Sequence, residues 1–469
     1  MCGIFGISGH SEAAHLAYLG LYALQHRGQE AAGIVSVDDA GVARAHKGNG
    51  LVSDVFNEEI IQSLEGATAI GHTRYSTAGG SAAVNTQPFL VRYRMGTLSI
   101  AHNGNLTNAG ALRRELVESG SLLQSTADTE ALIHLIARSA GPTPDEHIRE
   151  AVMKAEGAYS LLVTVGRVLY AVVDPRGFRP LMLGKVGDAT VVASESCALD
   201  IVGARITCEL EPGSVVRIEG GVVEYLEPLP PKPLKRCVFE LVYFSRPDSM
   251  VFGESVNLFR RNLGRALARE HPAPGSDCVF SVPDSSNAAA LGYAEAAGLP
   301  LEHALIRNHY VGRTFIHPVQ AGRDAKVKIK YNAVREIIAG KSVVVVDDSI
   351  VRGTTSRGLV AMIRQAGARA VHFRVASPPT VGPCYYGIDT PTREELIASN
   401  HTVEEIRKYL AVDSLGYLSL DGMVHASEGD ADRFCHACFS NQYPTEIPAD
   451  ATTSGYAADL VRTSLGIPA

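Results

Sequence analysis

A cysteine stands at position 2 of the chain, in the opening stretch MCGIFGI. Once Met1 is removed, Cys2 carries a thiol and a free α-amine, and a reference pKa of about 7.7–8.0 makes such an amine a useful base near neutral pH. A thiol becomes a strong nucleophile when a neighbouring group takes its proton, and here both groups belong to one residue. The stretch therefore favours an N-terminal nucleophile, although a chance cysteine on an apolar first strand has the same local sequence.

Polar stretches next to apolar runs offer the other groups that cleavage of an amide needs, namely an oxyanion hole and partners for the charged ends of a substrate. Asn103 and the backbone N–H of Gly104 can form the hole. Arg74 can bind a carboxylate through two hydrogen bonds, and Asp128 can bind an ammonium group. Taken singly, Asn-Gly also fits a plain turn and Arg74 a surface ion pair. The stretches are GHTRYSTAGG at 71–80, AHNGNLTN at 101–108 and TADTE at 126–130.

Two adjacent carboxylates end an apolar run in the second half of the chain, within VVVVDDSIVRGTTSRG at 343–358. Asp347 and Asp348 repel one another unless they bind hydroxyl groups or a cation such as Mg²⁺. The turn after them precedes a predicted helix, whose free N–H groups can cradle a phosphate. The stretch predicts a phosphate site beside the acid pair, and the alternative is a plain acidic strand end.

The tripeptide GKS at 340–342 resembles the end of a nucleotide-binding P-loop. The first glycine of that motif is missing, because Arg335 occupies its place, and GKS precedes a strand instead of following one. We therefore expect no ATPase site here.

Eight cysteines in 469 residues are typical of a reducing cytosol and not of a secreted disulfide framework. Four thiolates from three segments fit either a zinc site or an iron–sulfur cluster, whereas a lone C-x-x-C pair also fits a redox or buried pair. The four are Cys237, Cys384, Cys435 and Cys438. Three more have apolar neighbours and are expected in the core: Cys197, Cys208 and Cys278.

The proline-rich stretch LEPLPPKPLKR at 226–236 divides the chain, and we interpret it as a linker between domains. Before it, TLSIAH, YSLLVTV and VLYAVVD predict alternating strands of layered sheets, and helices are expected over 12–26, 111–119 and 129–140. After it, apolar strands such as 343–346 alternate with helices. That order predicts a parallel sheet covered on both faces.

The composition is that of a globular protein, with 46% hydrophobic residues and a net charge of -7. This charge gives no reason to expect nucleic acid or an acidic membrane as a partner. No apolar run approaches the length of about 18 residues that spans a bilayer. The apolar start is interrupted by glycines and its first basic residue is Arg27, unlike a signal peptide. We expect a cytoplasmic protein.

The start of the chain, together with LQHRGQEAAGI, GHTRYSTAG and AHNGNLTN, resembles the glutaminase domain of the N-terminal-nucleophile amidotransferases. In that family the terminal cysteine attacks the side-chain amide of glutamine, forms a thioester and releases ammonia. The resemblance implies a four-layer αββα domain over residues 2–230. It also implies catalytic roles for Cys2, Asn103 and Gly104, and glutamine binding by Arg74 and Asp128.

The second half resembles the type I phosphoribosyltransferases, which implies an α/β domain with a central parallel sheet over 237–450 and a C-terminal tail at 451–469. In that family two acids hold the ribose hydroxyls of 5-phosphoribosyl 1-pyrophosphate (PRPP), and the following loop holds its 5-phosphate. The turn SVPDSSNAA at 281–289 resembles the one that binds pyrophosphate and metal. The implied PRPP-binding residues are Asp347, Asp348, Ser349, Arg352, Gly353, Thr354 and Thr355. The implied Mg²⁺ ligands are Ser285, Asp347 and Asp348.

The stretch RNHYVGRTFIHP at 307–318 resembles the start of the mobile lid of the same family. We expect the segment 307–330 to close over PRPP, with Gly312 and Gly322 as hinges and a series of basic residues facing the phosphates. Closure should raise glutaminase activity.

Both halves in this order resemble the amidophosphoribosyltransferase family, the glutamine-dependent first enzymes of purine synthesis. The resemblance implies glutamine and PRPP as substrates, purine nucleotides as feedback inhibitors and a homotetramer. For the four cysteines it favours the [4Fe-4S] cluster of one branch. That branch makes a propeptide before its cysteine, whereas here only Met1 precedes Cys2 and its removal is expected to suffice.

Two other interpretations deserve a test. Another N-terminal-nucleophile amidotransferase, of the glucosamine-phosphate or asparagine type, would not carry DDSIVRGTT. A PRPP sensor without catalytic activity would have no need of a glutaminase site. PRPP-dependent formation of glutamate distinguishes all three.

Overall fold

The computed structural model describes residues 1–75, 83–308, 330–427 and 431–448. The tail expected from residue 451 lies outside these ranges. So do positions 309–329, which hold most of the expected lid with Gly312 and Gly322, and the end of the polar stretch at 71–80.

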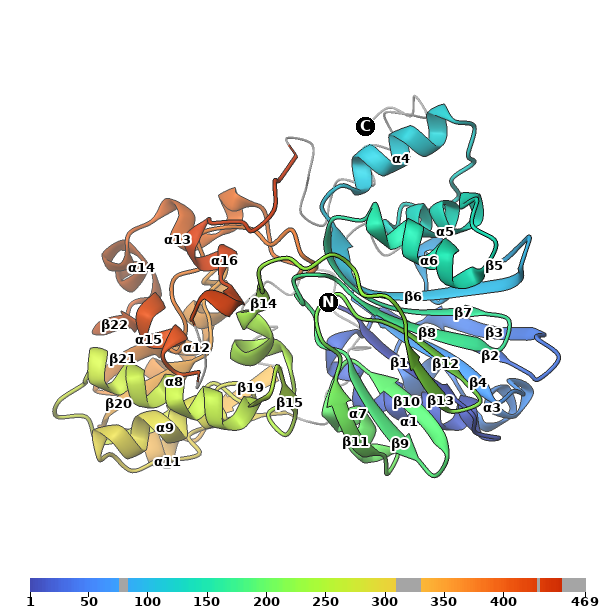
Figure 1. Ribbon diagram of the computed structural model, residues 1–469. Coiled ribbons are helices and arrows are strands. Elements are labelled where there is room, and N and C mark those ends of the chain that lie inside the picture. The colour runs from blue at the N-terminus through green and yellow to red at the C-terminus, as the bar shows by residue number, and fades with distance from the viewer. Residues whose placement is uncertain (76–82, 309–329, 428–430, 449–469) are drawn as a thin grey trace.

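The first half of the chain folds as two antiparallel sheets packed face to face (Figure 1). An apolar layer that includes Ile4, Leu162 and Val216 fills the space between them. Every residue of β1, β2, β4 and β7 is buried, because both faces of these strands are covered. The run YSLLVTV, expected as an alternating strand, lies in β7 and is buried throughout. In spatial order the first sheet contains β11 (Arg205–Glu209), β9 (Met182–Val186), β10 (Ala189–Ala193), β1 (Gly3–Ser8), β4 (Thr68–Arg74), β2 (Ala31–Val37) and β3 (Ala43–Asn49), and the second contains β13 (Val222–Tyr225), β12 (Val215–Glu219), β8 (Val168–Val173), β7 (Gly157–Val165), β6 (Gly96–Leu106) and β5 (Phe89–Tyr93).

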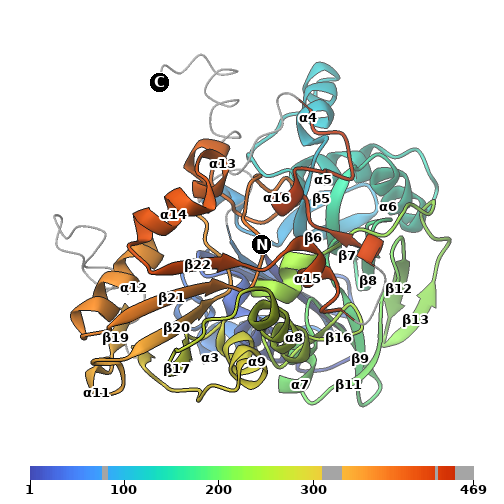
Figure 2. The same cartoon turned by 90° about the vertical axis from the view of Figure 1, so that its left-hand side faces the viewer.

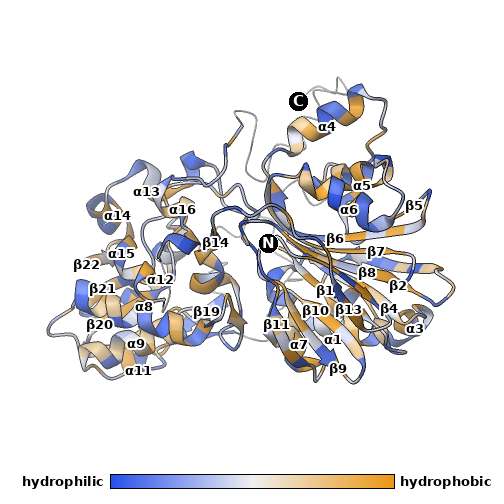
Figure 3. Ribbon diagram, in the orientation of Figure 1, coloured by the Kyte–Doolittle hydropathy of each residue, from blue (hydrophilic) through white to orange (hydrophobic). Residues whose placement is uncertain are grey.

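Helices cover the outer face of each sheet, which confirms the predicted four-layer αββα arrangement. The helix expected over 12–26 is α1 followed by a 3₁₀ turn (Gln25–Arg27), and the helices expected over 111–119 and 129–140 are α4 and α5. Figure 3 shows hydrophobic and hydrophilic residues side by side on α5 and α6, as expected of helices with one face on a sheet. The first sheet carries α1 (Ala13–Ala23), α2 (Val52–Val55), α3 (Glu58–Ser63) and α7 (Ser196–Ile201), and the second carries α4 (Ala109–Glu118), α5 (Thr129–Arg138) and α6 (Pro144–Met153).

The second half is built on a parallel sheet, in the order β17 (Cys278–Ser281), β20 (Ser342–Asp347), β21 (Ala370–Val375) and β22 (Ser414–Tyr417). Val344 and Val346 of β20 face the core under α8 and α9, while Val343 and Val345 face the core under α12. Successive side chains of a strand point to opposite faces, so the apolar run is explained by helices on both sides. The helices are α8 (Val256–Glu270) and α9 (Asn287–Ala297) on one face, and α11 (Arg335–Ile338), α12 (Thr354–Gln365) and α14 (Val403–Leu410) on the other.

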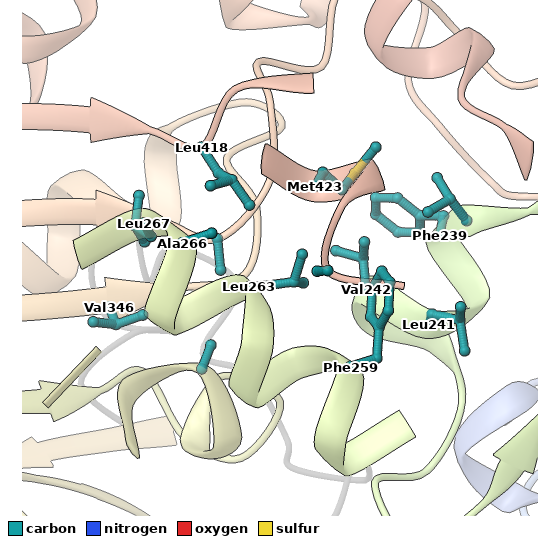
Figure 4. Close-up of a cluster of buried hydrophobic side chains, with 14 of the residues drawn as sticks. Phe239, Leu241, Val242, Phe259, Leu263, Ala266, Leu267, Val346, Leu418 and Met423 are labelled. Atoms are coloured by element: carbon teal, nitrogen blue, oxygen red, sulfur yellow. The ribbon is translucent and has the colours of Figure 1, made fainter. Parts of the chain in front are cut away.

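Short elements complete this half and join it to the first. A π-helix (Glu240–Phe244) packs with α8 and α15 in an apolar core that includes Phe239, Leu263 and Met423 (Figure 4). The N-terminus lies where the two halves meet in Figure 1, and it is near the middle of the molecule in Figure 2. The remaining elements are β14 (Arg236–Cys237), β15 (Met250–Val251), β16 (Glu254–Ser255), β18 (Leu305–Arg307), β19 (Tyr331–Ala333), β23 (Phe434–Cys435), α13 (Ile397–Asn400), α15 (Leu420–Val424), α16 (Ala437–Ser440) and 3₁₀ turns at Ala83–Asn85, Arg393–Glu395 and Ala431–Arg433.

One core prediction is wrong. Cys197 and Cys278 are buried as expected, but Cys208 is partly exposed, because β11 is an edge strand of the first sheet. None of the described helices is long and apolar enough to cross a membrane.

Candidate active sites

The nucleophile predicted at Cys2 lies just before β1, next to Tyr75 at the end of β4 and to Asn103 of β6. Its side chain is largely buried, with 7% of the residue exposed. The Cys2 nitrogen, which becomes the α-amine when Met1 is removed, donates to Asn103 Oδ1 at 3.3 Å. The thiol donates to the carbonyl oxygen of Tyr75 at 3.7 Å. The residue is therefore held by both of its functional groups.

Two donors suited to an oxyanion stand next to it. Asn103 is fully buried, and its Nδ2 group has no hydrogen-bond acceptor among the described residues. A buried unpaired donor is costly and points to a partner that arrives with the ligand. Gly104 has a φ of 151°, and a Cβ there would lie 2.0 Å from the carbonyl oxygen of Ala158. Only glycine fits this position, and Gly104 lines the same cavity as Cys2.

The two residues predicted to bind the charged ends of glutamine line the same cavity as Cys2. Asp128 accepts hydrogen bonds from the backbone nitrogens of Leu106 at 2.9 Å and Thr129 at 2.8 Å. Burial opposes ionisation of Asp128, but the nearby His102 and these hydrogen bonds outweigh it and lower the pKa of the carboxyl. Arg74, at the end of β4, is also buried, and burial lowers its pKa. The site thus holds a carboxylate and a guanidinium around one cavity.

A role for His102 was not predicted from the sequence, yet its imidazole ring lies next to the Asp128 carboxylate. Its Nδ1 lies 3.1 Å from Thr129 Oγ1 and 3.5 Å from Asp128 Oδ1. Burial would lower the pKa of His102, but the Asp128 carboxylate outweighs burial and raises it. His102 and Asp128 therefore form a buried ion pair at mildly acidic pH, between the ordinary pKa values of a carboxyl and an imidazole.

The cavity is small, about 20 Å³, and would hold little more than one water molecule. Besides the predicted residues, the described lining contains Tyr75, Asn85, Gln87, His102 and Ala127. Gln87 links two of the walls, because its Oε1 accepts from the His102 nitrogen at 2.8 Å and its Nε2 donates to Thr129 Oγ1 at 3.0 Å. Tyr75, His102 and Ala127 lie within the polar stretches that the sequence marked, but no motif marked Asn85 or Gln87, and the contacts of Gln87 span 15 and 42 positions of sequence.

The acid pair predicted to bind PRPP lies at the carboxyl end of β20, and both residues are buried. Ser285 Oγ donates to Asp348, and Ser286 Oγ lies 3.3 Å from a carboxylate oxygen of each acid. Ser349 Oγ donates to Asp348 Oδ1 at 2.7 Å. Burial, together with the charge of Asp348, raises the pKa of Asp347 well above its usual range, and burial raises the pKa of Asp348 as well. Ligand hydroxyls or a cation would relieve this repulsion.

The loop after the acids leads directly into α12. Gly353 has a φ of 74°, and a Cβ there would lie 2.8 Å from Ile397 Cδ1. Thr354 and Thr355 form the first turn of the helix, where backbone N–H groups have no partner within the helix. Arg352, predicted to bind PRPP, pairs with Glu395 at 3.1 Å on the surface instead of contacting the acids.

The four cysteines predicted to hold a cluster come from three segments that lie together. Cys237 and Cys435 are paired in register across the short parallel strands β14 and β23. The backbone nitrogens of Val381 and Gly382 donate to the Cys438 carbonyl at 2.9 and 3.0 Å, which brings the segment of Cys384 alongside. All four thiols are free.

The thiols also act on one another electrostatically. Burial is the main cause that raises the pKa of Cys237 to about 11, and Cys384 adds to it. Burial and the neighbouring cysteines likewise raise the pKa values of Cys435 and Cys438. Within the described ranges, no group of three or more His, Cys, Asp or Glu side chains is already arranged around a metal position. The three cysteine-bearing segments are adjacent, but the four thiols would have to move closer together to bind a metal.

Known proteins are similar to this chain over both of its halves. A family model described as a glutamine amidotransferase domain matches residues 72–200. An amidophosphoribosyltransferase of Bacillus subtilis is 49% identical over 456 residues, covering 96% of this chain and 95% of that protein. One of Archaeoglobus fulgidus is 45% identical over 460 residues, covering 96% and 99%.

Two solved structures are similar over the whole fold. One, described as the allosteric regulatory enzyme of purine biosynthesis, has a TM-score of 0.92 at 48% identity and covers 97% of this chain and 99% of its own. The other is a glutamine PRPP amidotransferase from B. subtilis complexed with ADP and GMP. It has a TM-score of 0.91 at 47% identity, with coverage of 97% and 99%.

Proposed function

The chain belongs to the amidophosphoribosyltransferase family, and we propose that it performs the family reaction with Cys2 as the nucleophile and the Asp347–Asp348 pair as the PRPP-binding acids. The reaction converts glutamine, water and PRPP into 5-phosphoribosylamine, glutamate and pyrophosphate, a step of purine biosynthesis. The observation that carries the proposed residue roles is the unpaired Nδ2 group of buried Asn103 beside the Cys2 nitrogen.

The first half-reaction takes place at Cys2. The α-amine accepts the thiol proton, directly or through water, and the sulfur attacks the amide carbon of glutamine. Asn103 Nδ2 and the Gly104 N–H donate to the oxyanion that forms. The amide nitrogen leaves as ammonia with a proton, and water then hydrolyses the thioester to glutamate. Arg74 and Asp128 hold the α-carboxylate and α-ammonium of the substrate.

The second half-reaction takes place at the edge of the parallel sheet. Asp347 and Asp348 accept hydrogen bonds from the ribose hydroxyls, while the N-terminus of α12 with Thr354 and Thr355 binds the 5-phosphate. Ammonia attacks the anomeric carbon of the ribose, and the bond from this carbon to the pyrophosphate oxygen breaks. Ser349, Gly353 and Arg352 complete the proposed PRPP site, and Arg352 would have to leave Glu395 to do so.

Magnesium fits this site. Hydroxyl and carboxylate oxygens are its preferred protein ligands, and Mg²⁺ commonly uses one or two carboxylates together with substrate phosphates. Ser285, Asp347 and Asp348 would hold it, and it would supply positive charge for the leaving pyrophosphate. Burial and the charge of Asp348 raise the pKa of Asp347, and a bound cation would offset the repulsion between the two carboxylates.

A [4Fe-4S] cluster at Cys237, Cys384, Cys435 and Cys438 is the second proposed cofactor. Its support is the donor set, four free thiols from three adjacent segments. The cluster would serve as a structural link that holds the chain around β23 and α16 against β14. Anaerobic purification should yield iron and acid-labile sulfide in a ratio near one, whereas stoichiometric zinc without iron would contradict the proposal.

We also propose how the enzyme is regulated, how its subunits assemble and in which compartment it works. The similar B. subtilis structure that contains ADP and GMP supports feedback inhibition by purine nucleotides. A homotetramer is proposed from the family alone. Eight free cysteines support a reducing compartment such as the cytoplasm.

One assay tests the proposed function against its alternatives. Glutamate release is measured with glutamine alone and with glutamine plus PRPP and Mg²⁺. We expect release to rise with PRPP, and ammonia to replace glutamine as nitrogen donor. Glutamate release that is the same with and without PRPP would favour another type of amidotransferase. PRPP binding without any glutamate release would favour a sensor.

A further inference from the structure

A buried arginine lies directly against the nucleophile residue. Arg27, in the 3₁₀ turn after α1, is fully buried, and its Nε donates to the carbonyl oxygen of Cys2 at 3.0 Å. Burial alone would lower the pKa of Arg27, but the carboxylates of Glu240 and Glu195 outweigh it and raise the pKa. The main chain of Cys2 is therefore held by a permanently charged group.

Two carboxylates hold this guanidinium from opposite sides. Glu195, which precedes α7 in the first half of the chain, accepts from Arg27 Nη1 and also from Ser249 Oγ at 2.8 Å. Glu240 belongs to the second half and accepts from Arg27 Nη2 with both oxygens, at 2.7 and 2.9 Å. A buried charge of this kind is stable only with partners of good geometry, so the orientation of Arg27 depends on both.

Glu240 is itself fixed. It is fully buried at the start of the π-helix, and it also accepts from Ser245 Oγ at 3.0 Å and from Arg179 Nη1 at 3.2 Å. The segment between β14 and β15, which contains this π-helix, faces the first half of the molecule in Figure 1. A π-helix in a short segment often marks a functional constraint. Here it directs a carboxylate across the domain boundary.

We propose that Glu240 is a positioning residue for glutamine cleavage, which acts through Arg27 to hold Cys2 in its attacking orientation. The carbonyl, nitrogen and thiol all belong to Cys2. If Arg27 no longer held the Cys2 carbonyl, the peptide group could rotate and move the α-amine away from Asn103 Oδ1. Cleavage of glutamine then depends on the second half of the molecule even before PRPP binds. The inference rests on the proposed role of Cys2 and adds a residue that takes no part in the chemistry itself.

The test is the Glu240→Gln variant of the full chain, which keeps the shape and removes the charge. We expect kcat for glutamine-dependent synthesis to fall about 10- to 100-fold, because a small misplacement of reacting groups has effects of this size. KM for PRPP and the ammonia-dependent rate should stay within about twofold. Alkylation of Cys2 by iodoacetamide, followed by mass spectrometry of the N-terminal peptide, should slow by a similar factor, while the partly exposed Cys208 reacts as in the wild type.

A matched control separates positioning from stability. Glu254 is another poorly exposed carboxylate of the second half; it forms an ion pair with Arg433 and is not among the residues that line the Cys2 cavity. Glu254→Gln should lower the melting temperature without slowing glutamine cleavage or alkylation of Cys2. The double variant Arg27→Lys, Glu240→Gln should have nearly the same kcat for glutamine-dependent synthesis as Arg27→Lys alone. Both changes weaken the same contact, that of Arg27 with the Cys2 carbonyl.

Wild-type kcat and alkylation rates in Glu240→Gln would overturn the inference, and so would an equal loss in the ammonia-dependent rate. If Glu240→Gln does not fold, Glu240→Asp carries the same comparison, since it keeps the charge and shortens its reach. A wild-type protein without any glutaminase activity would instead refute the proposed function.

Discussion

Replacement of Asp128 by asparagine tests the glutamine site most sharply, because it changes charge and leaves the shape. In the wild type, one carboxylate oxygen accepts from the Leu106 nitrogen and the other from the Thr129 nitrogen. An asparagine must turn its NH₂ group toward one of these two donors. His102 loses the anion that raises its pKa, so that burial then lowers this pKa.

The size of the effect follows from the contacts that are lost. A hydrogen bond between the substrate ammonium and a carboxylate is worth about 1.5–3 kcal/mol, so kcat/KM for glutamine should fall roughly 10- to 150-fold. One unpaired backbone donor costs a further 1–3 kcal/mol of folding stability, approximately.

The loss of stability should depend on pH. The pKa of His102 is raised from 6.5, so its contribution is complete below pH 6.5 and disappears as the pH rises through the folded value. The pKa of Asp128 is lowered from 3.8, so its contribution is present above pH 3.8 and disappears as the pH falls through the folded value. The difference in melting temperature between wild type and Asp128→Asn should be largest near pH 5–6, between these limits.

The assay compares glutamine-dependent and ammonia-dependent synthesis in the wild type, in Asp128→Asn and in the control Asp39→Asn, which removes an exposed carboxylate of the same domain. Only the glutamine-dependent rate of Asp128→Asn should fall. An unchanged kcat/KM for glutamine in that variant would refute the assignment, and an equal loss with ammonia would show that the damage is general.

Three further changes test the remaining assignments. Cys2→Ala should abolish glutamine-dependent synthesis and leave ammonia-dependent synthesis intact; residual glutaminase activity would exclude Cys2 as nucleophile. Replacing both Asp347 and Asp348 by asparagine should remove PRPP binding by calorimetry while basal hydrolysis of glutamine persists, and the loss of two repelling buried acids should raise the melting temperature without ligands. Cys435→Ser should remove iron and acid-labile sulfide and lower the melting temperature; retention of a full iron content would rule out this ligand set.

The sequence predicted the residues that lie in local motifs. Cys2 precedes β1, Arg74 ends β4, Asn103 lies in β6 and Asp128 caps α5, and all four stand in or beside the polar stretches that the sequence marked. Asp347 and Asp348 were visible because an apolar strand leads directly into a glycine-containing turn and a helix.

The supporting residues could not be predicted in this way. Arg27 and Glu240 are 213 positions apart, and neither residue type nor spacing marks a buried pair that forms only when two domains meet. His102 stands next to Asn103 within a quoted motif, but its role depends on Thr129 and Asp128, which another element supplies. Cys208 was misplaced because apolar neighbours do not distinguish an edge strand from a central one.

An isotope experiment tests directly whether one chain cleaves glutamine and delivers its amide nitrogen to PRPP. Glutamine labelled with ¹⁵N at the amide is incubated with the protein, PRPP, Mg²⁺ and excess unlabelled ammonium at a pH where ammonia is mostly protonated. We expect equal amounts of glutamate, pyrophosphate and phosphoribosylamine, with ¹⁵N retained in the phosphoribosylamine. Glutamate formed at the same rate without PRPP, with no pyrophosphate and no label in the product, would contradict this expectation.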